Sequence, residues 1–272
     1  MTQPPVIGAA LTLEGLRANR DWILDAPRDL ELQAFTEAGV LDGDWPAIAD
    51  EILTLLDGHT GRRGLHGPFW GFSIAAIDPD VRAVVQRRLD AALDVAATMS
   101  ADQIVIHSPF NPWIEANLFT SDYLAERFFD ACHATLAPAV ARAADAGVTF
   151  VIENCEDTDP HARCRLADSL DSAAVAVSID TGHAHFAHRM HGAPPVDAFV
   201  AAAGPRLQHV HLQDIDGAAD RHWPLGEGEI PWPAVLAAAA RNAPAARLLV
   251  ETHGAGTTRA SIEHLQARGI GR

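Results

Sequence analysis

The sequence contains no lysine, so each of its 20 basic residues is an arginine. A Schiff base with a carbonyl substrate needs a lysine amine, and this absence therefore excludes imine chemistry at a side chain. Any covalent or acid–base step has to rely on carboxylates, imidazoles or bound ions instead.

Cysteine is almost as scarce, with only Cys132, Cys155 and Cys164 present. Three is too small and too odd a number for a framework of disulfides, which typifies small secreted domains. It is also too few for an iron–sulfur centre with four thiolate ligands. We therefore expect a cytoplasmic protein in a reducing environment.

Basic residues are few compared with acidic ones, because the sequence has 20 basic and 36 acidic residues, which give a formal net charge of −16. Such a balance repels phosphate backbones at long range, so nucleic acid is not expected as a partner. No apolar run approaches the roughly 20 residues that cross a bilayer, and no basic segment opens the chain. We expect a soluble, unprocessed protein without a membrane partner, either a monomer or a homo-oligomer.

Short β-rich runs alternate with longer segments of helical period along the whole chain. The segments 79–99 and 121–146, for example, carry apolar residues at three- and four-residue spacing, as helices packing on a barrel do. Strands are expected at residues 6–11, 30–35, 64–66, 103–107, 148–153, 175–180, 207–212 and 248–251. With 272 residues, the pattern predicts one α/β domain over residues 1–272, a single (β/α)8 TIM barrel.

Acidic or imidazole side chains occur where six of these strands should end. They are His66, His107, Glu153, Asp180, His211 and Glu251. A closed parallel barrel points all of its strand ends at one rim, so residues far apart in sequence converge there. A charged residue at the end of a buried strand is costly unless a cation meets it. Oxygen and nitrogen ligands without cysteine predict Zn²⁺, Mn²⁺, Co²⁺ or Mg²⁺ at the mouth of the barrel.

Two loops add further candidates near the same rim. Asp180-Thr-Gly-His183 follows the sixth strand, and a turn at the glycine can return the imidazole of His183 toward the carboxylate. After the seventh strand, Asp220 and His222 are two residues apart and can hold a further ion. Arg221 between them can neutralise a phosphate or pair with a nearby acid, and the sequence leaves both open.

These motifs resemble the xylose isomerase-like barrels, a family that includes endonuclease IV and many sugar isomerases and epimerases. The resemblance implies a core of four ligands shared with the epimerases, at Glu153, Asp180, His211 and Glu251. It implies five more, as in endonuclease IV, at His66, His107, His183, Asp220 and His222. By that analogy three ions are expected, which are Zn²⁺, Mn²⁺ or Co²⁺ in preference to Mg²⁺. Glu153 would bridge the first two ions, and His183, Asp220 and His222 would hold the third.

The remaining candidates are aromatic and histidine side chains around this constellation. Trp70 and Trp113 follow the third and fourth strands and can either stack on a small substrate ring or cap the barrel top. His209 lies on the same face of its strand as His211 and is expected one layer below the site. The histidines at 185, 188 and 191 are expected on a solvated segment, and Glu31 is a rim candidate without a role.

Two reactions fit this constellation, and hydrolysis ranks first. With three ions, the site would hydrolyse a phosphoester of a small phosphorylated sugar or polyol. With one ion, it would isomerise or epimerise a sugar or sugar phosphate, with Glu153 and Glu251 exchanging a proton on opposite faces of an enediolate. In that case His183 and Arg221 would bind substrate oxygens. A catalytically silent sugar-phosphate sensor is a third alternative, with little need for so many ligands.

Overall fold

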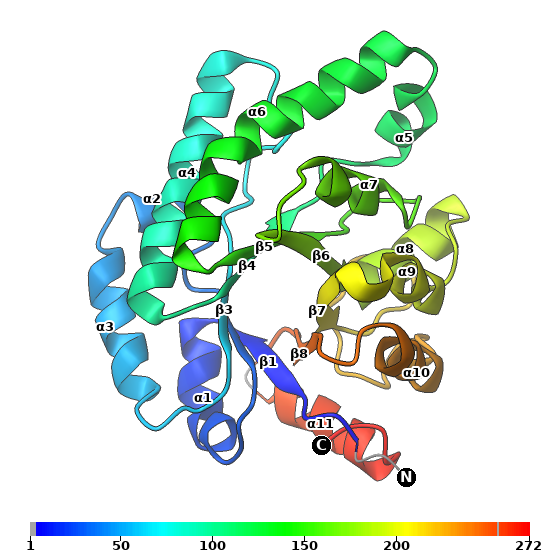
Figure 1. Ribbon diagram of the computed structural model, residues 1–272. Helices are drawn as coiled ribbons and strands as arrows, with labels where there is room; N and C mark the ends of the chain where they lie inside the picture. The colour runs from blue at the N-terminus through cyan, green and yellow to red at the C-terminus, as the bar shows by residue number, and fades with distance from the viewer. Residues whose placement is uncertain (1–3, 255) are drawn as a thin grey trace.

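The structure is a computed structural model that describes residues 4–254 and 256–272. Eight parallel strands form a closed barrel in the order β1 to β8, and helices surround it (Figure 1). The strands are β1 (Gly8–Leu11), β2 (Leu30–Leu32), β3 (Arg63–His66), β4 (Gln103–His107), β5 (Thr149–Glu153), β6 (Val175–Asp180), β7 (Leu207–Leu212) and β8 (Arg247–Val250). The prediction of a single (β/α)8 barrel is confirmed.

The helices fill the segments between the strands and pack around the barrel. They are α1 (Leu13–Leu24), α2 (Ala38–Leu41), α3 (Trp45–Leu55), α4 (Pro79–Met99), α5 (Pro112–Leu118), α6 (Asp122–Ala146), α7 (Ala162–Ser169), α8 (Thr181–His191), α9 (Val196–Ala203), the 3₁₀ helix η1 (Gly204–Arg206), α10 (Trp232–Asn242) and α11 (Thr257–Ala267). No helix in the described ranges is both long and apolar enough to cross a bilayer.

Local chemistry explains where the two longest helices begin and end. The Asp78 side chain accepts hydrogen bonds from the backbone N–H groups of Asp80 and Val81 and so caps the start of α4. Helix α6 starts at Asp122, one residue later than expected, and Gly147 ends it with a φ of 69°. A left-handed residue at this position is common at helix ends, and glycine adopts it without steric cost.

Five strands differ from the predicted bounds, by one residue at β3 and β5 and more widely at β1, β2 and β8. The backbone N–H of Ile7 bonds to the carbonyl of Arg272, so the residues before Gly8 are tied to the carboxyl terminus. Residues 4–7 and the carboxyl terminus accordingly lie side by side near α11, where the Arg272 N–H also donates to the Pro5 carbonyl (Figure 1). Strand β2 ends at Leu32 and β8 at Val250, so Glu251 is the first residue after its strand.

Alternation along the strands separates the barrel interior from the layer under the helices. Val105, Val151 and Ala176 form a small apolar cluster of their own. The residues two positions further along these strands are His107, Glu153 and Ser178, which are paired across β4, β5 and β6. Every second side chain of a strand faces the same side of the sheet. The apolar cluster therefore lies one layer below the polar residues at the carboxyl end of the barrel.

Candidate metal centre at the barrel mouth

The nine residues expected to bind metal all lie at the carboxyl end of the barrel. Six occupy one of the last two positions of a strand or the position directly after it, as the sequence suggests. His183 is in the first turn of α8, and Asp220 and His222 lie in the loop between β7 and α10. The structure brings these residues together in three neighbouring groups that share Glu153 or adjoin it.

The first group consists of His66, His107 and Glu153. The Glu153 Oε2 lies 3.4 Å from the Nε2 of His107 and 3.9 Å from the Nε2 of His66. Glu153 is only 1% exposed, and both of these partners are imidazoles. The candidate ligand atoms of the three residues lie within 4.8 Å of one another, which is close enough for a shared ion.

The second group is centred on the Nδ1 atom of His211. This nitrogen contacts the Glu153 carboxylate directly and lies 3.3 Å from the Oε2 of Glu251. Glu153, Asp180 and His211 offer ligand atoms within 4.8 Å of one another, and all three are buried. Glu251 adjoins this group through its contact with His211.

The third group joins α8 to the loop after β7. The Oδ2 of Asp220 lies 3.3 Å from the Nε2 of His183 and 3.2 Å from that of His222. The backbone of His222 has a φ of 49°, in the left-handed region that a side chain such as histidine seldom adopts. A strained residue of this kind typifies functional sites, where the surrounding structure fixes it.

Gln213 connects the second and third groups through hydrogen bonds, a role that the sequence does not predict. Its buried side-chain amide donates to the carboxylates of Asp180 at 3.2 Å and Asp220 at 2.8 Å. Its carbonyl oxygen accepts from the backbone N–H of His222 at 2.9 Å. A Cβ atom at Gly182 would lie 2.4 Å from this amide, so the Asp-Thr-Gly-His motif needs glycine for close approach.

The electrostatics of the site distinguish its carboxylates. Burial alone raises the pKa of Glu153, but the adjacent imidazole of His211 outweighs burial and holds that pKa well below its usual range. Burial dominates at Asp180 and raises its pKa to about 6. For His211, burial lowers the pKa, but Glu251, Glu31 and Glu153 together raise it well above the ordinary value.

These donor sets fit divalent cations. Three buried or nearly buried carboxylates, those of Glu153, Asp180 and Glu251, face imidazoles at the rim, where apposed acidic groups repel one another unless positive charge intervenes. All the ligand atoms are oxygen or nitrogen except the Cys155 sulfur, which lies with Glu153 and His183 in one further group. Oxygen and nitrogen ligands suit Zn²⁺, Mn²⁺ or Co²⁺.

Ion uptake is expected to release protons, and its affinity should rise with pH. Burial lowers the pKa of His222, but the bond to Asp220 and the charges of Glu251 and Asp180 together outweigh it and raise the pKa to about 9. A folded-state pKa above 6.5 means that this proton stabilises the ion-free protein fully below pH 6.5 and ceases to do so as pH approaches 9. An ion must displace the proton. The increase in melting temperature on adding Zn²⁺ should therefore be larger at pH 9 than at pH 6.5, and equal increases would contradict this.

The structure also shows the surroundings of Arg221, Trp70 and Trp113. Arg221 pairs with Asp216, with its Nη2 3.2 Å from the carboxylate, and so adopts the acid-pairing alternative. Trp70 contacts Phe69, which stacks on His107, whereas Trp113 on α5 is 77% exposed. An exposed indole is available to a substrate but does not cap the barrel.

The histidines after β6 required a correction. They were expected on a solvated segment, but they lie in α8, and His185 is only 7% exposed. Its Nε2 lies 3.8 Å from the carboxylate of Glu229. His188 is half-buried and donates to the Ala193 carbonyl at 2.7 Å, and His191 alone is exposed. His185 is buried because it follows the buried Thr181 by four residues, which places both on the inner side of the helix.

The sequence of this chain is similar to a family model and to those of known proteins. Residues 28–268 match a family model described as the xylose isomerase-like TIM barrel. The uncharacterized protein MJ1311 of Methanocaldococcus jannaschii is 26% identical over 194 residues, 68% of this chain and 62% of that protein. Fructoselysine 3-epimerase of Escherichia coli O157:H7 is 25% identical over 146 residues, 52% of this chain and 48% of the epimerase. The chain thus matches less than two thirds of the length of either relative.

Solved structures share the fold over nearly the whole chain. The TTHB071 protein from Thermus thermophilus, soaked with ZnCl₂, is 26% identical with a TM-score of 0.73, covering 98% of this chain and 99% of that one. A D-tagatose 3-epimerase-like protein is 19% identical with a TM-score of 0.74, covering 97% of both chains. An AP endonuclease, family 2, from Brucella melitensis is 17% identical with a TM-score of 0.69, covering 97% of this chain and 98% of that one. The last two show the fold alone, and the comparisons together support an enzyme of the isomerase/epimerase or hydrolase type.

Proposed function

The chain belongs to the family of xylose isomerase-like TIM barrels, and from this premise we propose that it is a divalent-metal-dependent sugar epimerase or isomerase. The relative described as fructoselysine 3-epimerase and the epimerase folds among solved structures support this function over hydrolysis. The order of the two reactions expected from the sequence is therefore reversed. The substrate class is a small sugar or sugar derivative. Whether the substrate is phosphorylated, the oligomeric state of the protein and its cytoplasmic location stay predictions.

One observation carries the proposal, which is the convergence of Glu153 and Glu251 on the Nδ1 of His211. The Glu153 carboxylate contacts this nitrogen, and the Glu251 carboxylate lies 3.3 Å from it. Asp180 offers a ligand atom within 4.8 Å of those of Glu153 and His211, so three carboxylates lie near this imidazole. Such a set suits one ion with two carboxylates beside it, which is what proton transfer on both faces of a carbon requires.

The two glutamates have the chemistry to invert a carbon centre. A divalent ion held by the four residues would bind neighbouring substrate oxygens and acidify the C–H bond between them. Glu153, whose low pKa keeps it ionised, accepts the proton from one face. Glu251, in its protonated form, donates its proton to the opposite face and becomes a carboxylate, so the configuration inverts without any oxidant or reductant.

Two other side chains adjoin this core and are proposed to hold substrate oxygens. His183 stands in the first turn of α8, where its backbone N–H donates to Asp180 at 2.7 Å. Arg221 would first have to leave Asp216, with which it pairs at 3.2 Å. Exchanging a surface ion pair for a substrate contact costs little, because exposed pairs contribute at most about 1 kcal/mol.

Phosphoester hydrolysis is a second candidate, and one specific observation favours it. The five additional ligands that one ion does not need are also clustered, as His66 and His107 beside Glu153 and as His183 with Asp220 and His222. Three ions at these groups would clamp a phosphoryl group and stabilise the departing oxygen. The acidic surface does not oppose this candidate, because bound cations would attract the phosphate locally.

Isotope exchange and metal content together separate the two functions. The metal-loaded protein, prepared without an affinity tag, would be incubated in D₂O with a panel of ketoses, ketose phosphates and fructosamines. Epimerisation predicts deuterium on the carbon beside the carbonyl, observed by NMR, and its loss after chelation. No exchange with any sugar, together with about three ions per chain and cleavage of a nitrophenyl phosphodiester, would favour hydrolysis instead.

A further inference from the structure

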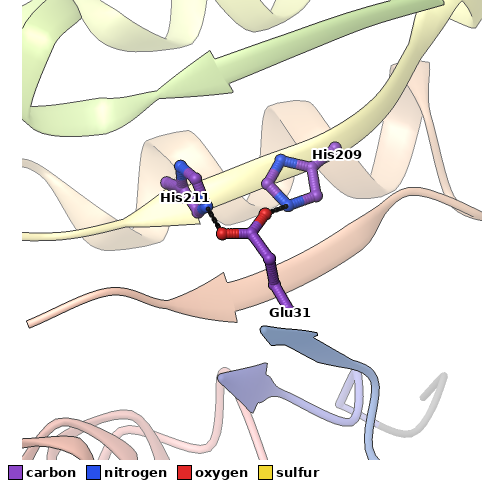
Figure 2. Close-up of side chains that lie close together, drawn as sticks. All are labelled: Glu31, His209 and His211. Carbon is purple, nitrogen blue, oxygen red and sulfur yellow. Dashed lines mark hydrogen bonds and ion pairs between the residues drawn. The ribbon is translucent and has the colours of Figure 1, made fainter. Parts of the chain in front are cut away.

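Glu31, a rim candidate for which the sequence predicts no role, lies beneath the proposed site and faces two histidines (Figure 2). It stands on β2, whereas His209 and His211 stand on β7, so its side chain crosses the barrel interior. Its neighbours across the adjacent strands are Ala10 and Gly64, which have almost no side chain. These two small residues leave the space through which Glu31 reaches the far wall.

Each carboxylate oxygen of Glu31 contacts a different imidazole. The Oε1 atom accepts from the Nε2 of His211 at 3.0 Å, and the Oε2 atom lies 3.1 Å from the Nε2 of His209. Behind them, the Nδ1 of His209 bonds to the hydroxyl of Ser178 at 2.8 Å. Glu31 and both histidines are about 1% exposed or less, so water does not compete for these contacts.

This arrangement determines which nitrogen of His211 is available to a cation. A carboxylate without a proton can only accept, so the Nε2 of His211 must carry the hydrogen that it donates. An ion at Nδ1 would take the place of the proton that this nitrogen shares with Glu153. The neutral imidazole then keeps its one N–H on Nε2, and the lone pair lies on Nδ1. Nδ1 is the atom that faces Glu153 and Glu251.

We propose that Glu31 is a positioning residue that fixes His211 with its Nδ1 lone pair directed at the ion, while His209 anchors the other oxygen of Glu31. The inference rests on the ion site of the proposed function and deepens it. A carboxylate behind a ligating histidine orients the ring and makes it a stronger ligand, and loss of such a partner typically weakens metal binding about 10- to 100-fold. The Glu31, His209 and His211 atoms also lie within 4.8 Å of one another, so an ion between them is the competing possibility.

The test compares Zn²⁺ binding by the full-length wild type and the Glu31→Gln protein, using competition with a chromophoric chelator. Glutamine keeps the volume of the side chain but removes its charge and one acceptor. We expect about 10- to 100-fold weaker affinity at the second group with an unchanged number of ions. Arg28→Met is the control, because Arg28 is also buried but pairs with Asp25 in the segment before β2, and Zn²⁺ affinity should not change.

A second measurement does not depend on the stability of the variant. Nitrogen-15 NMR of the histidine rings in Zn²⁺-loaded wild type should show the His211 proton on Nε2. A proton on Nδ1 would overturn the proposal, as would equal Zn²⁺ affinities in the wild type and Glu31→Gln. Loss of one whole ion from Glu31→Gln would instead make Glu31 a ligand and equally overturn the positioning role. If the wild type binds no ion at all, the proposed function fails before this inference is reached.

Discussion

Replacing Glu153 with glutamine should reduce epimerisation by about 10²- to 10⁴-fold, the range typical for loss of a general base. The amide keeps the shape of the side chain and one oxygen ligand, but it cannot accept a proton from carbon. Glu153 lies within reach of His66, His107 and His211 at once, so the variant should also bind metal more weakly. Initial rates at saturating metal, measured with each epimer as substrate, separate the loss of proton transfer from the loss of the ion.

The same substitution at Glu251 tests whether the two carboxylates act on opposite faces. Each variant should retain deuterium exchange with one epimer only, the one whose hydrogen faces the remaining glutamate, while inversion is lost in both. Glu156→Gln is the control, because Glu156 is an exposed carboxylate three residues beyond Glu153 and should leave the rate unchanged. Full activity in Glu153→Gln would eliminate the proposed mechanism.

The barrel was predictable because each of its elements is encoded locally. Strands β4, β6 and β7 coincide with the predicted ranges, since each alternates apolar residues with polar ones near a histidine or aspartate at its carboxyl end. The main errors fall on β1, β2 and β8, where the barrel closes and where the chain termini meet. Before β1, the partner of the Ile7 N–H is the Arg272 carbonyl, more than 200 residues away, and no local pattern predicts it.

The site was predictable only as far as its charged residues. Glu153 or Asp180 at the end of an apolar strand signals a buried charge that needs a partner. Gln213 carries no such signal because an amide is neutral, although it touches two of the three ligand groups. The sequence shows Glu31 as a charged residue in a strand. Its role depends on the space beside Ala10 and Gly64, and only the register of the paired strands places these small residues next to it.

Replacing Asp214 with asparagine should lower the free energy of unfolding by roughly 3 kcal/mol, because two buried donors would lose their acceptor and face an amino group instead. Its Oδ1 accepts from the backbone N–H groups of Ile215 and Ile230 at 3.0 and 3.2 Å. Its Oδ2 accepts from the N–H of Gly226 at 2.7 Å and from the Trp232 indole at 2.9 Å. Denaturant unfolding monitored by fluorescence and circular dichroism measures the loss.

The consequence should extend to the metal centre, because these four bonds shape the loop that carries Asp220 and His222. Asp214 also pairs with Trp223 through two backbone bonds, which close the loop directly behind both ligands. Asp214→Asn should therefore lose the ion of the third group while it retains the one at Glu153 and His211. Asp216→Asn is the control in the same loop, because Asp216 bonds to the exposed Arg221 and its loss should change stability far less. An Asp214 variant as stable as the wild type, with all its ions, would mean that the loop is held by other contacts.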